Sequence, residues 1–164
     1  MHGGKNVKFK QFQFLKNEAI KKLTALEQEP LRLRKRTIEE CLSADAVMLA
    51  YIGDAVYSMY VRERVVQMNI TKVQVLHTIV TEFICAKSQA KVLLEIEDTF
   101  TEQEQAIARR ARNSNVNVPK SSTVQEYRSS TAFEAVLGFL YETRQKERLQ
   151  DVMKQAFSIT LRGM

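Results

Sequence analysis

Two segments of the sequence are apolar on almost every helical face, and each contains one acidic residue. Residues 46–57 read AVMLAYIGDAVY and include Asp54, and residues 131–141 read TAFEAVLGFLY and include Glu134. A helix that is apolar on all sides is buried in the protein core. Burying an unpaired carboxylate costs several kcal/mol. Each acid therefore needs a partner from elsewhere in the fold.

A glycine accompanies each acid. Gly53 precedes Asp54, and Gly138 lies one helical turn after Glu134. Glycine inside a helix costs about 1 kcal/mol relative to alanine, so its presence needs a reason. The reason we expect is a close approach of two helix backbones. If the two helices cross at their glycines, the two acids converge.

Two convergent carboxylates suit a hard divalent cation such as Mg²⁺, for which Mn²⁺ can substitute. Such an ion lowers the pKa of a bound water and neutralises charge on a phosphodiester, which indicates phosphodiester hydrolysis. The sequence has two histidines and two cysteines, Cys41 and Cys85, and their spacing matches no zinc motif.

Two structural interpretations of the acids stay open at this point. Asp54 is also compatible with a core acid that pairs with an arginine from another helix. Glu134 is also compatible with the third residue of a capping box that Thr131 opens, because the spacing is correct.

The rest of the hydrophobic pattern is helical, and it predicts an all-α fold, a compact helical bundle. A chain with five glycines, two prolines and no long apolar–polar alternation is not typical of a β-rich protein. We expect a first helix with an apolar stripe from Phe12 to Leu26 that Pro30 ends. Further helices are predicted over 45–67, 72–96, from a Thr101–Glu104 capping box to Arg112, 124–142 and 144–161, with a loop over 113–122.

A length of 164 residues allows one ordinary domain, which we place at 44–164, after a basic helical extension over 1–43. Charge is unevenly distributed. Residues 45–104 carry five Lys/Arg and nine Asp/Glu, whereas 1–44 carry ten and five, and 105–130 carry five and one. An acidic centre between basic regions suits an enzyme that acts on a polyanion, although a solvated basic surface has the same composition.

Export and membrane insertion are not indicated by the sequence. No run of eighteen apolar residues is present, and the first residues include no apolar export segment. We therefore expect a cytoplasmic protein with free thiols.

Five motifs in order resemble a known enzyme family. LAYIGDAV resembles the signature helix of ribonuclease III catalytic domains, in which the Gly-Asp-Ala tripeptide carries a metal-binding aspartate. TAFEAVLGFL resembles the later helix that carries the second essential ligand, a glutamate. The motifs between them resemble the bacterial Mini-ribonuclease III subgroup: AKSQA at 86–90, ARNS at 111–114, and PKSS at 119–122 followed by Tyr127 and Arg128.

The resemblance implies a double-stranded-RNA endoribonuclease of all-α fold that works as a homodimer. Each subunit would cut one strand and leave 5′-phosphate and 3′-hydroxyl ends, with Asp54 and Glu134 as catalytic metal ligands. The subgroup is associated with maturation of the 23S ribosomal RNA precursor, so a ribosome or ribosomal protein is an expected partner. Tyr51, Tyr57, Met59 and Tyr60 surround a helix that one small monomer would not fully cover, which is in keeping with a dimer.

Two departures from the family pattern concern the metal site and RNA binding. Larger members carry a glutamate where this chain has Ala50 and an aspartate where it has Thr131, which leaves the number of metal ions open. They also carry a separate RNA-binding domain, so here we expect the catalytic domain to contact RNA itself. The basic segment 32–36 is one candidate. The others are Lys87, Arg109, Arg110, Arg112, Asn113, Lys120 and Arg128.

Two other functions fit part of the pattern. A catalytically silent helical RNA-binding or ribosome-associated protein would explain the missing acids at Ala50 and Thr131, but not the retained pair. An all-α nucleotide pyrophosphatase also uses Mg²⁺ on helical carboxylates. Its usual Glu-x-x-Glu pair is absent from both acid-bearing segments.

Overall fold

A computed structural model describes residues 3–27, 34, 36–115 and 117–164. Residues 1–34 and 35–164 form two separate compact units. The first unit contains α1 (Gly3–Glu27), on which the large apolar side chains from Phe9 to Leu26 are exposed. Pro30 and most of the basic segment 32–36 lie outside the described residues.

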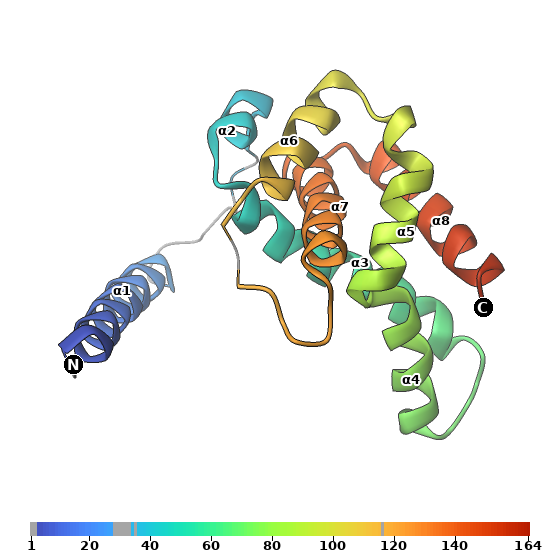
Figure 1. Ribbon diagram of the computed structural model, residues 1–164, viewed down its shortest axis with the longest axis horizontal. Helices are drawn as coiled ribbons and strands as arrows, with labels where there is room; N and C mark the ends of the chain where they lie inside the picture. Colours follow the sequence, from blue (N-terminus) through green and yellow to red (C-terminus); the bar gives the residue numbers. More distant parts are fainter. Residues whose placement is uncertain (1–2, 28–33, 35, 116) are drawn as a thin grey trace. The chain divides into compact units, whose positions relative to one another are not determined.

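The second unit is built entirely from helices in its described part (Figure 1). The helices are α2 (Ile38–Ser43), α3 (Ala46–Val66), α4 (Val73–Ile84), α5 (Ala86–Ile96), the 3-10 turn η1 (Glu97–Thr99), α6 (Glu102–Arg112), α7 (Val124–Glu142) and α8 (Lys146–Arg162). The prediction of an all-α fold is therefore confirmed. None of the described helices is long and apolar enough to cross a membrane.

Helix α7 forms the centre of the second unit and packs against α3, α5 and α6 (Figure 1). From Ser130 to Leu140, every residue of α7 except Glu134 is buried, as the sequence predicts. Helix α3 is different. Tyr51 is 82% exposed and Met59 is 60% exposed, as expected for a helix that one monomer does not fully cover. The prediction from the apolar pattern alone, that this helix is buried on all sides, is wrong. Within the described residues, α3 packs on one side only and leaves an apolar stripe open.

The predicted crossing of the two acid-bearing helices is present. A Cβ atom added to Gly53 would lie 1.8 Å from the carbonyl oxygen of Glu134, and one added to Gly138 would lie 1.9 Å from the carbonyl oxygen of Leu49. The backbones of α3 and α7 therefore touch at both glycines. No larger residue fits at either position without separating the helices.

A buried ion pair fastens α6 to α8. The predicted Thr101–Glu104 capping box opens α6, and Glu104 is only 1% exposed. Both carboxylate oxygens of Glu104 accept hydrogen bonds of 2.9 Å from the Arg148 guanidinium. The Arg148 side chain is 26% exposed, and because it pairs with Glu104 through two hydrogen bonds, the core accommodates the buried carboxylate.

The segment 72–96 differs from the prediction of one continuous helix. The chain is extended at Cys85, with φ −70° and ψ 150°, and this residue separates α4 from α5. Helix α4 packs against α3, whereas α5 packs against α7. The segment therefore divides into two helices because each packs against a different helix of the core.

Helix α2 belongs to the second unit. Cys41 is buried in its core, and the Arg110 guanidinium donates to the carbonyl oxygens of Leu42 and Ala44. An ion pair of 3.0 Å between Arg36 and Glu142 adds to this attachment. The structural boundary lies after Arg34, so residues 36–43 pack with the unit that holds both acids.

Candidate active site and RNA interface

Asp54 and Glu134 line one cleft of about 420 Å³, which we call the acid cleft. Its walls come from α3, α5, α7 and the loop that precedes α7. The polar side chains around the two acids are Tyr51, Gln89, Ser122, Tyr127, Ser130 and Thr131. The crossing of α3 and α7 therefore brings together the two acids that the sequence singles out.

Burial and mutual repulsion disfavour the ionised forms of the two acids in the acid cleft. Burial, together with the negative charge of Asp54, raises the pKa of Glu134 to about 8, and the Gln89 amide opposes both effects. Asp54 is exposed on α3, so the prediction that it is a buried carboxylate is wrong. Its remaining partial burial still raises its pKa, and the positive charge of Arg62 partly offsets this. A bound cation would relieve this unfavourable charge.

The structure does not support either structural interpretation of these acids. Within the described residues, neither Asp54 nor Glu134 forms an ion pair with a lysine or an arginine. Thr131 does not open a capping box, because α7 begins seven residues earlier, at Val124. The Thr131 hydroxyl instead donates to the carbonyl oxygen of Tyr127 at 2.9 Å.

The donor set of the acid cleft fits a hard divalent cation. Two carboxylates supply oxygen ligands, and Mg²⁺ commonly uses one or two protein carboxylates together with water and phosphate oxygens. Ala50 and Thr131, where larger family members carry acids, line the same cleft and add no charge. Across the described part of the chain, no cluster of three or more His, Cys, Asp or Glu side chains is present.

Gln89 is a cleft residue to which the sequence analysis assigns no role. Its side chain is 1% exposed and lies against Glu134, where the amide lowers the pKa of the carboxyl. Neither amide atom has a hydrogen bond of regular geometry among the described residues. A signal was available in the sequence, because Gln89 shares one helical face with Val92 and Ile96, both buried.

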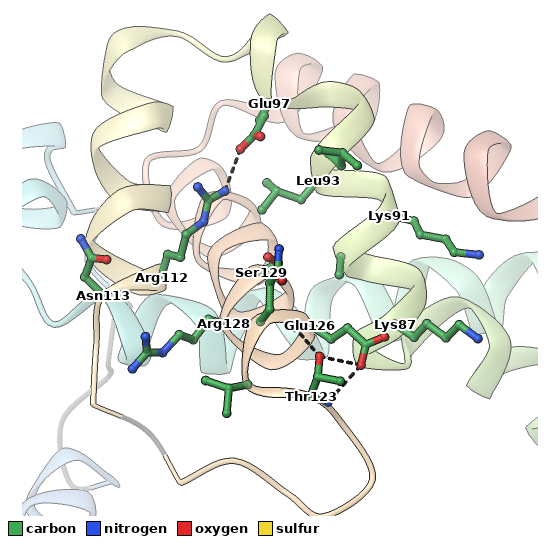
Figure 2. Close-up of a pocket in the computed structure, with 14 residues that line it drawn as sticks. Lys87, Lys91, Leu93, Glu97, Arg112, Asn113, Thr123, Glu126, Arg128 and Ser129 are labelled. Carbon is green, nitrogen blue, oxygen red and sulfur yellow. Dashed lines mark hydrogen bonds and ion pairs between the residues drawn. The ribbon is translucent and has the colours of Figure 1, made fainter.

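Four of the seven individually predicted RNA-contacting residues meet in a second cavity of about 760 Å³. This basic pocket lies between α5, the end of α6 and the start of α7, and it contains Lys87, Arg112, Asn113 and Arg128 together with Lys91. Figure 2 shows Lys87 and Lys91 on one side of the pocket and the other three on the opposite side. Cations spread in this way suit an extended polyanion better than one small anion.

Contacts within the basic pocket fix part of its wall. Arg112 forms an ion pair of 2.7 Å with Glu97, and Thr123 caps α7 by accepting a hydrogen bond from the Glu126 backbone N–H (Figure 2). The basic pocket adjoins the acid cleft, because the neighbouring residues Ser129 and Ser130 line one cavity each.

The other three candidates lie outside the basic pocket. Arg110 is engaged with the carbonyl oxygens that end α2, which accounts for its side chain structurally. Arg109 and Lys120 are exposed, and Lys120 follows Pro119 at the edge of the acid cleft.

Comparison with known proteins agrees with this geometry. Residues 47–145 match the Ribonuclease III domain family. The Mini-ribonuclease 3 of a Thermoanaerobacter species is 40% identical over 124 residues, which cover 75% of this chain and 87% of the relative. That of Symbiobacterium thermophilum is 40% identical over 123 residues, covering 74% and 95%.

A solved structure supports the same fold. The crystal structure of a Fusobacterium nucleatum protein superposes with a TM-score of 0.65 at 29% sequence identity, and the match covers 68% of this chain and 92% of that protein. From the matched domain, the similarity to these relatives and the helical fold, this chain belongs to the ribonuclease III family of endoribonucleases.

Proposed function

We propose that this protein is a Mg²⁺-dependent endoribonuclease that hydrolyses both strands of double-stranded RNA, with Asp54 and Glu134 as its catalytic metal ligands. The observation that carries the proposal is the convergence of these two acids in one cleft beside a basic pocket. The endoribonuclease fold and this arrangement of charges favour an active enzyme on a phosphodiester substrate over a catalytically silent RNA-binding protein.

The chain supplies position and charge for the reaction. When bound, Mg²⁺ or Mn²⁺ supplies the activation of water and the charge neutralisation that phosphodiester hydrolysis requires, leaving a 5′-phosphate and a 3′-hydroxyl. Asp54 and Glu134 would hold the ion from two helices whose spacing is set by backbone contact. Ala50 and Thr131 keep the remaining wall neutral, which limits repulsion of an approaching phosphate.

The basic pocket is the surface that we propose for the RNA backbone. A-form RNA offers shape, phosphates and 2′-hydroxyls rather than readable major-groove edges. Lys87, Lys91 and Arg128 would meet phosphates, and Asn113 is suited to a sugar hydroxyl. Because neighbouring residues of α7 line the two cavities, a strand bound in the basic pocket would extend toward the acids.

Cutting two antiparallel strands requires two acid clefts, which a homodimer provides. The exposed stripe of α3, formed by Met48, Tyr51 and Met59, is the apolar surface that we propose for this contact. Tyr57 and Tyr60 do not take part, because the core buries both. The similarity to bacterial Mini-ribonuclease 3 proteins favours the 23S ribosomal RNA precursor as substrate, in the cytoplasm and with ribosomal partners.

The test is cleavage of an end-labelled RNA duplex by the wild-type protein and the Asp54→Asn and Glu134→Gln variants, with Mg²⁺ and with excess EDTA. We expect Mg²⁺-dependent cuts in both strands by the wild-type protein. Each variant should lose more than about 100-fold in rate, because ligand loss exceeds the effect of removing an outer contact. The matched control is Glu63→Gln, an exposed acid of the same helix as Asp54.

Two results would contradict the proposal. Duplex binding without cuts under all metal conditions would favour a catalytically silent RNA-binding protein. Cleavage that persists in both variants would show that the acid cleft is not the reaction site.

A further inference from the structure

We propose that Gln89 is a positioning residue for Glu134, and that its amide keeps this carboxylate oriented for metal binding in the acid cleft. The inference rests on the proposed function, since it takes Asp54 and Glu134 as the metal ligands. It adds a residue from a third helix, α5, to a site that otherwise depends on α3 and α7.

The burial of Gln89 is the first observation behind this inference. A glutamine side chain at 1% exposure has given up its hydrogen bonds to water, and burying its amide without a partner is costly. Neither its Nε2 nor its Oε1 atom has a regular hydrogen bond among the described residues. Such a group in a cleft wall needs a partner that the protein alone does not fully supply.

The neighbour of Gln89 identifies that partner. Gln89 and Glu134 line the acid cleft together, on the packed helices α5 and α7. An N–H that donates to a carboxylate also favours its ionised form, which is the effect of this amide on Glu134. An ionised carboxylate is an acceptor on both oxygens, so one can receive the amide N–H while the other faces a cation. The Gln89 oxygen then remains as a neutral acceptor that lines the same cleft.

The packing of α5 makes Gln89 suitable for this task. Val92, Leu93 and Ile96 of the same helix are buried, and α5 packs directly against α7. The amide is therefore anchored to the same core as Glu134. A neutral positioning group also suits a cleft whose walls at Ala50 and Thr131 carry no additional acids, because it orients one acid without adding repulsion.

The experiment measures Mn²⁺ binding to the full-length protein without RNA, by isothermal titration calorimetry, together with the thermal unfolding midpoint of the metal-free protein. Gln89→Met keeps the length of the side chain and removes the amide. We expect Mn²⁺ to bind this variant about 10- to 100-fold more weakly, as when an outer-shell partner of a metal ligand is lost. The metal-free midpoint should stay the same or rise, because an unpaired buried amide is removed.

Two further variants make the result decisive. Ser88→Ala changes the adjacent residue of α5, which lines a different cavity, and should bind Mn²⁺ as the wild-type protein does. Gln89→Asn keeps an amide but shortens its reach, and should show the same weakening as Gln89→Met. If the Met variant fails to fold, the Asn variant gives the answer.

Each other outcome overturns a different statement. If the wild-type protein binds Mn²⁺ and both Gln89 variants bind it equally well, the inference is wrong while the proposed metal site stands. A lower midpoint with unchanged Mn²⁺ affinity would assign Gln89 a purely structural role. If the wild-type protein binds no Mn²⁺, the proposed metal site falls, and the inference falls with it.

Discussion

Glu134 combines features that rarely occur together in one residue. It lies in the middle of the central helix α7, its neighbours from Ser130 to Leu140 are buried, and it has no ion-pair partner among the described residues. Its pKa of about 8 means that in the metal-free protein the folded state holds a proton that the unfolded chain releases at much lower pH. The effect of Glu134 on the free energy of unfolding therefore depends on pH.

This property predicts a sign for the pH dependence of stability. Between the ordinary glutamate pKa of 4.5 and about 8, the folded state binds more protons than the unfolded state. The free energy of unfolding therefore falls as pH rises, by at most about 1.4 kcal/mol per pH unit. Glu134→Gln should remove this contribution, as urea unfolding in EDTA at pH 5 to 8 would show. The exposed Glu147→Gln variant should keep the wild-type slope, and equal slopes in all three proteins would contradict the prediction.

At the residue scale, the two acids could be predicted because each interrupts an apolar helix. Gln89 could not be assigned a role in the same way, since a glutamine carries no charge whose burial must be explained. Its position on the buried face of α5 gave a signal, but its neighbour Glu134 lies 45 positions further along the chain. Only the packing of α5 against α7 brings the two together.

At the scale of elements, the crossing of α3 and α7 makes a strong prediction about two glycines. Gly53→Ala and Gly138→Ala each place a Cβ within 2 Å of a backbone carbonyl oxygen, which cannot rotate away. We expect each to lower the free energy of unfolding by about 3 kcal/mol, the upper part of the usual range for overpacking. Gly163→Ala is the matched control, because the nearest atom would be 3.5 Å from the added Cβ. Denaturant unfolding measures all three, and two helix-crossing variants as stable as the control would refute the tight contact.

The interruption between α4 and α5 shows the limit of helical periodicity. Residues 72–96 contain neither proline nor glycine, and their apolar stripe continues through Cys85. The backbone is extended at Cys85 because α4 packs against α3, whereas α5 packs against α7 and α8. Tertiary partners of this kind are absent from local sequence, whereas the Thr101–Glu104 capping box is a local signal and was predicted correctly.

At the scale of the whole molecule, the exposed stripe of α3 should govern self-association. Met59→Lys places a charge on the stripe, and we expect it to convert a dimer into a monomer in size-exclusion chromatography with light scattering. Leu94→Lys is the control, since Leu94 is 74% exposed on α5, away from the stripe, and should leave the mass unchanged. A dimeric Met59→Lys protein would show that the contact lies on another surface.

The backbone contact at Gly53 and Gly138 also decides what can move when substrate arrives. Helices α3 and α7 touch through main-chain atoms, so their two acids belong to one rigid body and have no hinge between them. Any adjustment to an incoming strand falls instead to the connection between α6 and α7, whose described residues form no helix. We therefore expect the site to be preorganised, so that the separation between Asp54 and Glu134 stays the same when RNA binds. We also expect a duplex to be selected by whether its backbone can adapt to this fixed arrangement of α3 and α7.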